Sequence, residues 1–290
     1  MIFSLVPKNT SATERDKRTT STVSRDIKVL ILSKKAKPAN AKDEWEHAES
    51  LENLDLNRFT HCLILGDFKI DFNQFKNTHF FYGSNQEPAT FKKMHNPNVT
   101  VFWTKGLKEF EKVLTISFLK ILENEETPAK PLCGRHVHDS EYTQPQEHER
   151  EEALRQGLST FKTHSGRIFF ERVRTLSKQD YCTIRTLSAL EFDGTEFLRS
   201  TLEGMHLSQD ESINGRDVIT PNQIYTGFIE RHEIWKKSRL VQDPKETFPK
   251  NLKIDVSSDG DNFEVFCPVH LMGQARGSHI VIKYYKGRSL

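Results

Sequence analysis

The sequence lacks the short motifs that identify several large classes of enzyme. It contains no Gly-x-Gly-x-x-Gly, no phosphate-loop Gly-Lys followed by Ser or Thr, no Gly-x-Ser-x-Gly and no His-Glu-x-x-His. These absences leave no dinucleotide fingerprint, no nucleophile elbow and no zinc-protease helix. No nucleophile stands beside a matched base in the sequence, so we expect no small-molecule substrate.

Cysteines and long apolar runs are also scarce. The chain has 4 Cys in 290 residues, and no pair has the spacing of a metal knuckle. Reduced, small-hydrophobic thiols favour an intracellular protein of the nucleus or cytoplasm. No apolar run approaches the roughly 20 residues of a membrane span, and the opening "MIFSLV" is too short for a secretory signal. We therefore expect no membrane association.

The chain as a whole has no large excess of positive or negative side chains. Lys and Arg total 42 against 40 Asp and Glu, a formal net charge of +2, so the chain is not uniformly basic. Locally, residues 1–42 carry ten basic against three acidic side chains. Basic segments release counterions from phosphates, and tyrosines can stack on bases. The candidate nucleic-acid-binding residues are Arg15, Lys17, Arg18, Lys34, Lys35, Lys37, Arg231, Lys236, Lys237, Arg239, Lys283, Lys286 and Arg288.

Changes in composition along the chain predict four regions. Residues 8–26 are almost devoid of apolar side chains, which predicts a disordered basic Ser/Thr-rich tail over 1–26. Residues 27–124 should form an α/β domain, a small mixed sheet with helices. Residues 125–158 are acidic and contain Pro and His, which indicates a linker. Residues 159–290 should form an α+β domain with an antiparallel sheet.

Periodicity and capping signals place the elements of these domains. Strands are predicted at 27–32, 61–68, 78–83, 99–103, 166–174, 180–192 and 278–285, and a hairpin at 252–268 turning at Asp259 and Gly260. Helices are predicted at 43–54, 106–126, 193–207 and 220–240. The last helix has the clearest start, because Thr220, Pro221 and Gln223 supply a cap, a first-turn proline and a capping-box spacing.

One stretch, "PLCGRHVHDSEYTQPQEHEREE" from Pro131, gathers a thiol and three imidazoles. Cys133, His136, His138 and His148 could hold a structural zinc ion in a tetrahedron. Zinc ligands usually come as two knuckles, and this stretch has only one. Neighbouring acidic side chains could equally well accept protons from these histidines. The alternative reading is a pH-responsive acidic linker.

A second stretch, "LILGDFKIDF" from Leu63 to Phe72, places carboxylates where open α/β sheets keep their sites. Asp67 and Asp71 could share a divalent cation with a phosphate, helped by His61. The string resembles the Gly-Asp-Phe-Asn motif of the endonuclease/exonuclease/phosphatase family over a few residues. Lys69 stands at the asparagine position, and Gly277 to Val281 lacks the aspartate of the closing Ser-Asp-His, so we do not transfer that family's site.

Two hypotheses of function remain open. The first is a non-catalytic intracellular binding protein, a subunit or adaptor of a macromolecular assembly with protein partners and, as a further candidate, nucleic acid. The second is a divalent-metal-dependent phosphoesterase or nuclease that uses Asp67, Asp71 and His61.

Overall fold

The computed structural model describes residues 2–4, 27–39, 41–52, 54–208, 215, 217–256 and 263–273. Over these residues the chain has the expected mixed α/β fold. A parallel five-stranded sheet with helices forms the N-terminal half, and small antiparallel sheets with helices form the C-terminal half. The predicted strand at 278–285 and the hairpin turn at Asp259 and Gly260 lie outside the described residues. No helix within the described ranges is long and apolar enough to cross a membrane.

The N-terminal half is built on the parallel sheet, in the order β3-β2-β4-β5-β6. Its strands are β2 (Val29–Ser33), β3 (Glu46–Ala48), β4 (His61–Leu65), β5 (His79–Ser84) and β6 (Val99–Trp103). Every residue of β2, β4 and β6 is buried. Parallel strands covered on both faces are written as continuous apolar runs, which is why the sequence predicts these strands correctly.

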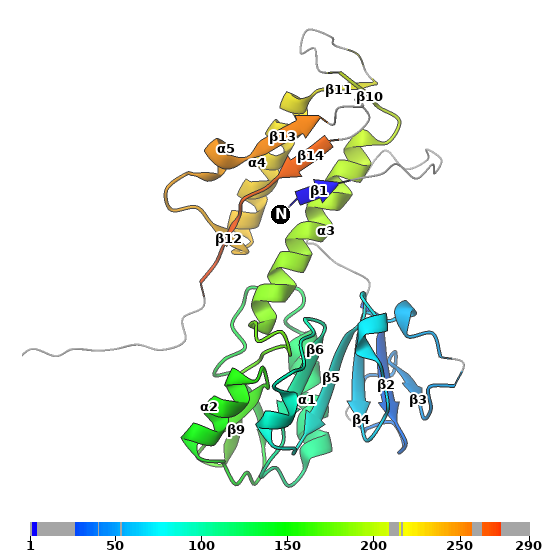
Figure 1. The fold of residues 1–290 in the computed structure, drawn as a ribbon, viewed down its shortest axis with the longest axis vertical. Coiled ribbons are helices and arrows are strands. Elements are labelled where there is room, and N and C mark those ends of the chain that lie inside the picture. The colour runs from blue at the N-terminus through cyan, green and yellow to red at the C-terminus, as the bar shows by residue number, and fades with distance from the viewer. Residues whose placement is uncertain are drawn as a thin grey trace, which may run out of the picture.

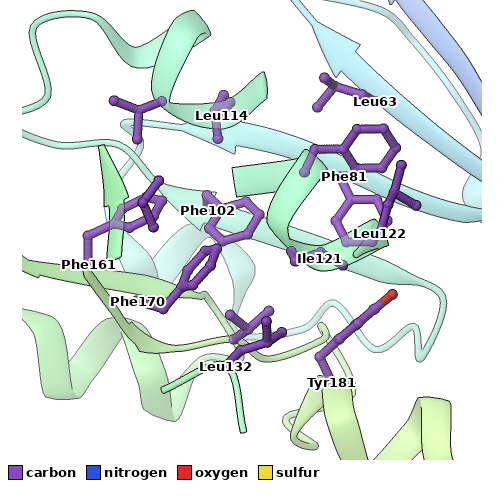
Figure 2. Packing of buried hydrophobic residues seen from close by; sticks show 14 of the residues in the cluster. Leu63, Phe81, Phe102, Leu114, Ile121, Leu122, Leu132, Phe161, Phe170 and Tyr181 are labelled. Carbon is purple, nitrogen blue, oxygen red and sulfur yellow. The ribbon is translucent and has the colours of Figure 1, made fainter. Parts of the chain in front are cut away.

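Different elements cover the two faces of this sheet. One face packs against α1 (Phe110–Leu122) and an antiparallel sheet of order β7-β9-β8. The strands of that sheet are β7 (His136–Asp139), β8 (Thr160–His164) and β9 (Arg167–Arg172). Figure 2 shows the core between them, where Phe102, Phe161 and Phe170 lie together. The other face is covered by α2 (Glu147–Arg155) and by the 3-10 turns η1 (Leu56–Arg58), η2 (Phe72–Gln74) and η3 (Pro88–Phe91).

Residues 125–158, expected to be a linker, contain two of these ordered elements. Strand β7 pairs with β9, and α2 begins with a capping box between Gln146 and Glu149. Val137 on β7 and Ala153 on α2 are buried in the cores on either side of the parallel sheet. The low apolar content of this segment hides two amphipathic elements, each of which needs few buried side chains.

The C-terminal half contains three helices and several short strands. The helices are α3 (Tyr181–Leu202), α4 (Pro221–Lys237) and α5 (Phe248–Asn251). A sheet of order β1-β14-β13 joins β1 (Ile2–Ser4), β14 (Phe263–Phe266) and β13 (Lys253–Val256). Two further pairs are β10 (His206–Leu207) with β11 (Val218–Ile219), and β12 (Val241–Gln242) with β15 (His270–Leu271). The predicted hairpin strands and the Thr220–Gln223 capping box are confirmed.

Two predictions of secondary structure are wrong. Residues 180–192 are not a strand followed by a new helix at Asp193, because one helix, α3, runs through both and starts at its cap Asp180. Its buried residues Cys182, Thr186, Leu190, Gly194 and Leu198 recur every four positions, and this period outweighs the β-branched content near its start.

The helix predicted at 43–54 is also wrong, because residues 46–48 form β3. Its apolar residues recur every three positions but do not share a face. Trp45 packs in the core that contains Phe118, whereas Ala48, Leu51 and Leu54 pack on the opposite side of the sheet.

The described residues form two units that meet along α3, as Figure 1 shows. We call the elements β2–β9, α1 and α2 the N-terminal unit, and β1, β10–β15, α4 and α5 the C-terminal unit. Tyr181 and Cys182 at the start of α3 belong to a core of the N-terminal unit. Leu190 and Leu198 further along the same helix belong to the separate core of the C-terminal unit.

Candidate functional site

The three residues of the phosphoesterase hypothesis do not come together. Asp67 is exposed just beyond the carboxyl end of β4, whereas His61 is buried at the amino end of the same strand. Asp71 caps η2 and accepts hydrogen bonds from the Asn73 amide at 3.2 Å and the Gln74 Nε2 at 3.0 Å. The full length of β4 therefore lies between the proposed histidine and the carboxylate of Asp67.

The four candidate zinc ligands are distributed over a loop, a strand and a helix. Cys133 precedes β7, which carries His136 and His138, and His148 is exposed on α2. His136 Nε2 lies 2.8 Å from Asp139 Oδ1, and His138 Nε2 lies 3.9 Å from Glu109 Oε2. Within the part of the chain that the structure describes, no group of three or more His, Cys, Asp or Glu side chains could hold a metal ion.

The candidate basic residues fall into separate places. The group of Lys34, Lys35 and Lys37 follows β2 in the N-terminal unit, whereas Arg231, Lys236, Lys237 and Arg239 lie on or just after α4 in the C-terminal unit. Several have internal partners. Lys35 pairs with Glu111, Arg231 with Asp193, and Lys236 with Glu233.

Lys37 Nζ donates to backbone carbonyls of Asp43 and Trp45. The remaining candidates, Arg15, Lys17, Arg18, Lys283, Lys286 and Arg288, lie outside the described residues.

The fold instead gathers ionisable groups at the amino-terminal ends of the central strands of the parallel sheet, which we call its amino edge. Strands β4 and β5 pair so that their first residues, His61 and His79, stand side by side. Glu125 follows the end of α1, and the first two turns of α3 supply Tyr181 and Arg185. Segments up to 124 residues apart in the chain, from 61 to 185, thus meet at one buried point.

Glu125 is the centre of this cluster. Its Oε2 accepts hydrogen bonds from Arg185 Nε at 2.9 Å and Nη2 at 2.5 Å. Its Oε1 accepts from Tyr181 Oη at 2.6 Å, and His61 Nε2 lies 3.6 Å from the same oxygen. The Glu125 and Arg185 side chains are only 9% and 14% exposed, so this is a nearly dry ion pair.

The protonation states follow from burial and charge. Burial alone would raise the pKa of Glu125, but the interactions with His61 and then Arg185 outweigh it and hold that pKa well below its usual range. Burial, and then the Glu125 charge, raises the pKa of Tyr181 well above its usual value. Burial, and then the Arg185 charge, lowers the pKa of His79 well below its usual value. At neutral pH the cluster therefore holds an anionic Glu125 beside neutral Tyr181 and neutral His79.

Aromatic rings enclose the polar groups. The His79 and Tyr181 rings meet edge to face at 5.1 Å between centroids, and His79 lies 4.7 Å from Phe81. Figure 2 shows Tyr181 reaching from α3 toward the apolar side chains around Phe81 and Leu122. On its far side, His79 Nε2 forms a 2.9 Å hydrogen bond with Thr100 Oγ1. Such surroundings strengthen the ion pair, because little water screens it.

His79, Glu125, Tyr181 and Arg185 are not among the candidate site residues that the sequence predicts. One local signal points to the place: the dipeptide Thr-His opens both β4 and β5, at Thr60–His61 and Thr78–His79. Two parallel neighbours that begin with the same polar pair indicate a shared polar edge. The partners Glu125 and Arg185 carry no such signal, because 60 residues separate them.

The geometry ties segments together. Both carboxylate oxygens of Glu125 are occupied by protein donors, and the members come from β4, β5, the turn after α1 and α3. A saturated carboxylate in a dry site orients its neighbours and offers no oxygen to an incoming substrate. The fold and the site thus define an α/β protein of two units with a buried ion pair, Glu125 with Arg185, where the units meet; we call this place the joint.

Comparisons with known proteins give no family. No family model and no curated protein matches the sequence. Among solved structures, the fold is similar to a sheath tail protein from Desulfitobacterium hafniense, with a TM-score of 0.48 and 12% sequence identity. The match covers 68% of this chain and 46% of that protein, so this chain corresponds to less than half of its length. We draw no functional conclusion from a likeness at this level.

Proposed function

We propose that this chain is a non-catalytic binding protein that acts as a subunit or adaptor of a macromolecular assembly. The observation that supports it best is the completion of the C-terminal sheet by β1. Residues Ile2–Ser4 pair antiparallel with Glu264–Phe266 of β14, far away in sequence. Addition of a remote strand to a sheet edge is a common mode of protein recognition, because the edge offers unpaired backbone donors and acceptors.

The candidate catalytic groups add weight to the non-catalytic reading. Asp67 lies just beyond the carboxyl end of β4 and His61 is its buried first residue, and both carboxylate oxygens of Glu125 already accept hydrogen bonds from protein donors. The metal-dependent phosphoesterase therefore stays the weaker alternative. Its test is an assay on phosphodiester substrates with Asp67→Asn, and a metal-dependent activity lost in that variant would favour the enzyme.

The experiment for the proposed function asks whether the edge of β14 accepts a strand from another molecule. A chain lacking residues 1–6 is titrated with a labelled peptide of residues 1–12, and binding is followed by fluorescence polarisation. The matched control peptide carries Phe3→Pro, since proline removes a backbone donor and is excluded from strand interiors. Circular dichroism first checks that the shortened chain is folded.

We expect saturable binding of the native peptide and at least about tenfold weaker binding of the proline peptide, because one or more ladder hydrogen bonds are lost. Equal binding of both peptides, or no binding of either to a folded chain, would contradict strand addition as the recognition mode.

Nucleic acid is a second proposed partner, for which exposed Lys34 and Lys35 are candidates. If the chain binds neither DNA nor RNA at low salt, where electrostatic binding is strongest, the nucleic-acid proposal is excluded.

We also propose a revised division of the chain. The apolar cores separate at α3, so folding units that meet near residues 183–189 fit the packing better than a boundary at 125–158. Limited proteolysis with mass spectrometry tests this division. Early cleavage within 125–158 would restore the original boundary.

A further inference from the structure

Helix α3 is firmly attached to the C-terminal unit. Asp193, in the middle of α3, pairs with Arg231 Nη1 at 3.2 Å and accepts a hydrogen bond from Trp235 Nε1 at 2.8 Å. The ring of Phe197 lies against Gly227 of α4, where an added Cβ would come within 2.1 Å of it. The close approach of the two helices makes α3 and the C-terminal unit one body.

The attachment of α3 to the N-terminal unit is confined to its first two turns. Tyr181 and Cys182 enter the core there, and Arg185 reaches Glu125. Beyond this point Leu187 is 37% exposed, and Leu190 already belongs to the other core. The helix is therefore held to the parallel sheet at one end, through the ionic cluster and the packing of Tyr181 and Cys182.

The turn that carries Glu125 touches both units. Within it, Asn124 Nδ2 donates to Lys130 O at 3.0 Å, and the Cys182 thiol donates to the same carbonyl at 3.5 Å. Ala129 of the same turn packs against the core of the C-terminal unit. Residues 124–130 thus form a wedge at the base of α3, and Glu125 is the charged group that fixes the wedge to the helix.

A tight turn precedes α3 and offers a pivot. Lys178 has φ +65°, a left-handed conformation that non-glycine residues adopt mainly in turns. The Thr175 amide donates to Gln179 O at 3.0 Å, and Asp180 then caps the helix. Rotation about residues 177–180 would swing α3 together with the whole C-terminal unit.

We propose that the Glu125–Arg185 pair, with Tyr181, is a latch that fixes the angle of α3 and thereby the orientation of the C-terminal unit relative to the parallel sheet. Closed, the latch makes the two units one rigid body. Opened, it leaves α3 joined to the parallel sheet by the turn at 177–180, while the chain between β1 and β2 remains the other covalent connection between the units. The pair sits where a small displacement of Arg185 is amplified along the length of α3. This inference does not depend on strand addition at β14.

The test measures the distance between the units in solution. Spin labels are attached at Lys69→Cys in the N-terminal unit and Lys250→Cys in the C-terminal unit, both exposed, in a Cys133→Ser background. Double electron–electron resonance then gives the distance distribution with Glu125 intact and in Glu125→Gln. A second label pair, Lys69→Cys with Lys162→Cys, lies within the N-terminal unit and checks that this unit keeps its shape.

The matched control is Glu196→Gln on the same helix. Glu196 also pairs with an arginine, Arg199 at 2.6 Å, but that pair is exposed and far from the joint. We expect one narrow distribution for the parent chain and the control. Glu125→Gln should broaden the distance distribution between the units at least about twofold, with an unchanged distance inside the N-terminal unit.

The milder variant Tyr181→Phe removes a single donor to Glu125 and keeps the ring, so it serves if Glu125→Gln fails to fold. It should give a smaller broadening in the same direction. A distribution between the units that stays as narrow as that of the parent in a folded Glu125→Gln, or in Tyr181→Phe if the first variant does not fold, would overturn the latch and leave the pair a purely stabilising contact.

Discussion

Replacing Glu125 by Gln leaves the Arg185 guanidinium in a nearly dry site without its counter-charge. The substitution keeps the size and shape of the side chain and retains one carbonyl oxygen that can accept from Tyr181. It removes the negative charge that three hydrogen bonds from Arg185 now satisfy. The perturbation is therefore mainly electrostatic, with little change in packing.

The magnitude follows from burial. Two unit charges about 4 Å apart attract by about 4 kcal/mol at an effective dielectric constant of about 20. Removing one partner of a buried pair costs roughly 3–5 kcal/mol, since the other charge is left uncompensated. Because Arg185 is still 14% exposed and Gln keeps one acceptor, we expect a loss at the lower end, about 3 kcal/mol in the free energy of unfolding.

Urea unfolding measures this loss, with tryptophan fluorescence as the probe. Trp45 and Trp103 lie in the cores of the N-terminal unit and Trp235 in that of the C-terminal unit, so the two transitions can be distinguished if they separate. With a slope of about 2 kcal/mol per M, a loss of about 3 kcal/mol lowers the midpoint of the N-terminal unit by about 1.5 M.

A double-mutant cycle identifies the cause. In Glu125→Gln with Arg185→Met neither charge remains, so the double variant should be more stable than Glu125→Gln alone. Glu196→Gln, which breaks an exposed pair, should cost less than about 1 kcal/mol. A destabilisation by Glu125→Gln no larger than that of this control, or additive effects of Glu125→Gln and Arg185→Met, would contradict this prediction.

Three further outcomes are expected. Burial lowers the pKa of His79, so the unfolded chain binds a proton below about pH 6.5 that the native chain excludes; stability should fall with acid by up to about 1.4 kcal/mol per pH unit, and His79→Gln should flatten that slope in urea titrations between pH 7 and 5.5. Gly106 has φ +83° and an added Cβ would lie 2.0 Å from the Thr143 carbonyl oxygen, so Gly106→Ala should lower the thermal midpoint more than Gly134→Ala, where φ is +77° and the space is open. Thiol labelling of the native chain should be fast at half-buried Cys133 alone, because the other three cysteines are buried; fast modification of more than one thiol would refute this.

Local signals predict much of the fold. The apolar runs of β4, β5 and β6 and the stripe of α1 are each complete within a short window, and the capping box at Thr220 marks the start of α4. Strand β3 is misread because the apolar residues on either side of it pack in different cores, and helix α3 because the β-branched residues near its start favour a strand. Trp45 faces one side of the sheet and Leu51 the other, so a helix-like spacing arises without a helix.

The polar cluster is harder to predict than the fold. Thr-His at the start of β4 and β5 is visible in the sequence, but which carboxylate it meets depends on how α1 ends and α3 begins. Glu125 is one of 40 acidic residues, and nothing near it in sequence distinguishes it from its exposed neighbours Glu123 and Glu126. Its role comes from the topology, which brings the ends of two helices to the amino edge of one sheet.

A buried ion pair at this joint calls for a reason other than stability, since hydrophobic replacements of such pairs are often neutral or stabilising by about 1–4 kcal/mol. An apolar contact between α3 and the sheet would tolerate rotation of the helix, because leucine side chains pack similarly over a range of angles. The guanidinium of Arg185 offers a rigid fork that matches the Glu125 carboxylate in one orientation, and Tyr181 fixes its second oxygen. Any other angle of α3 leaves a charge unpaired in a dry site. The pair therefore increases the free-energy difference between the aligned orientation of α3 and all other orientations. A protein whose two units must present their surfaces in one relation to a partner benefits from that difference more than from extra stability.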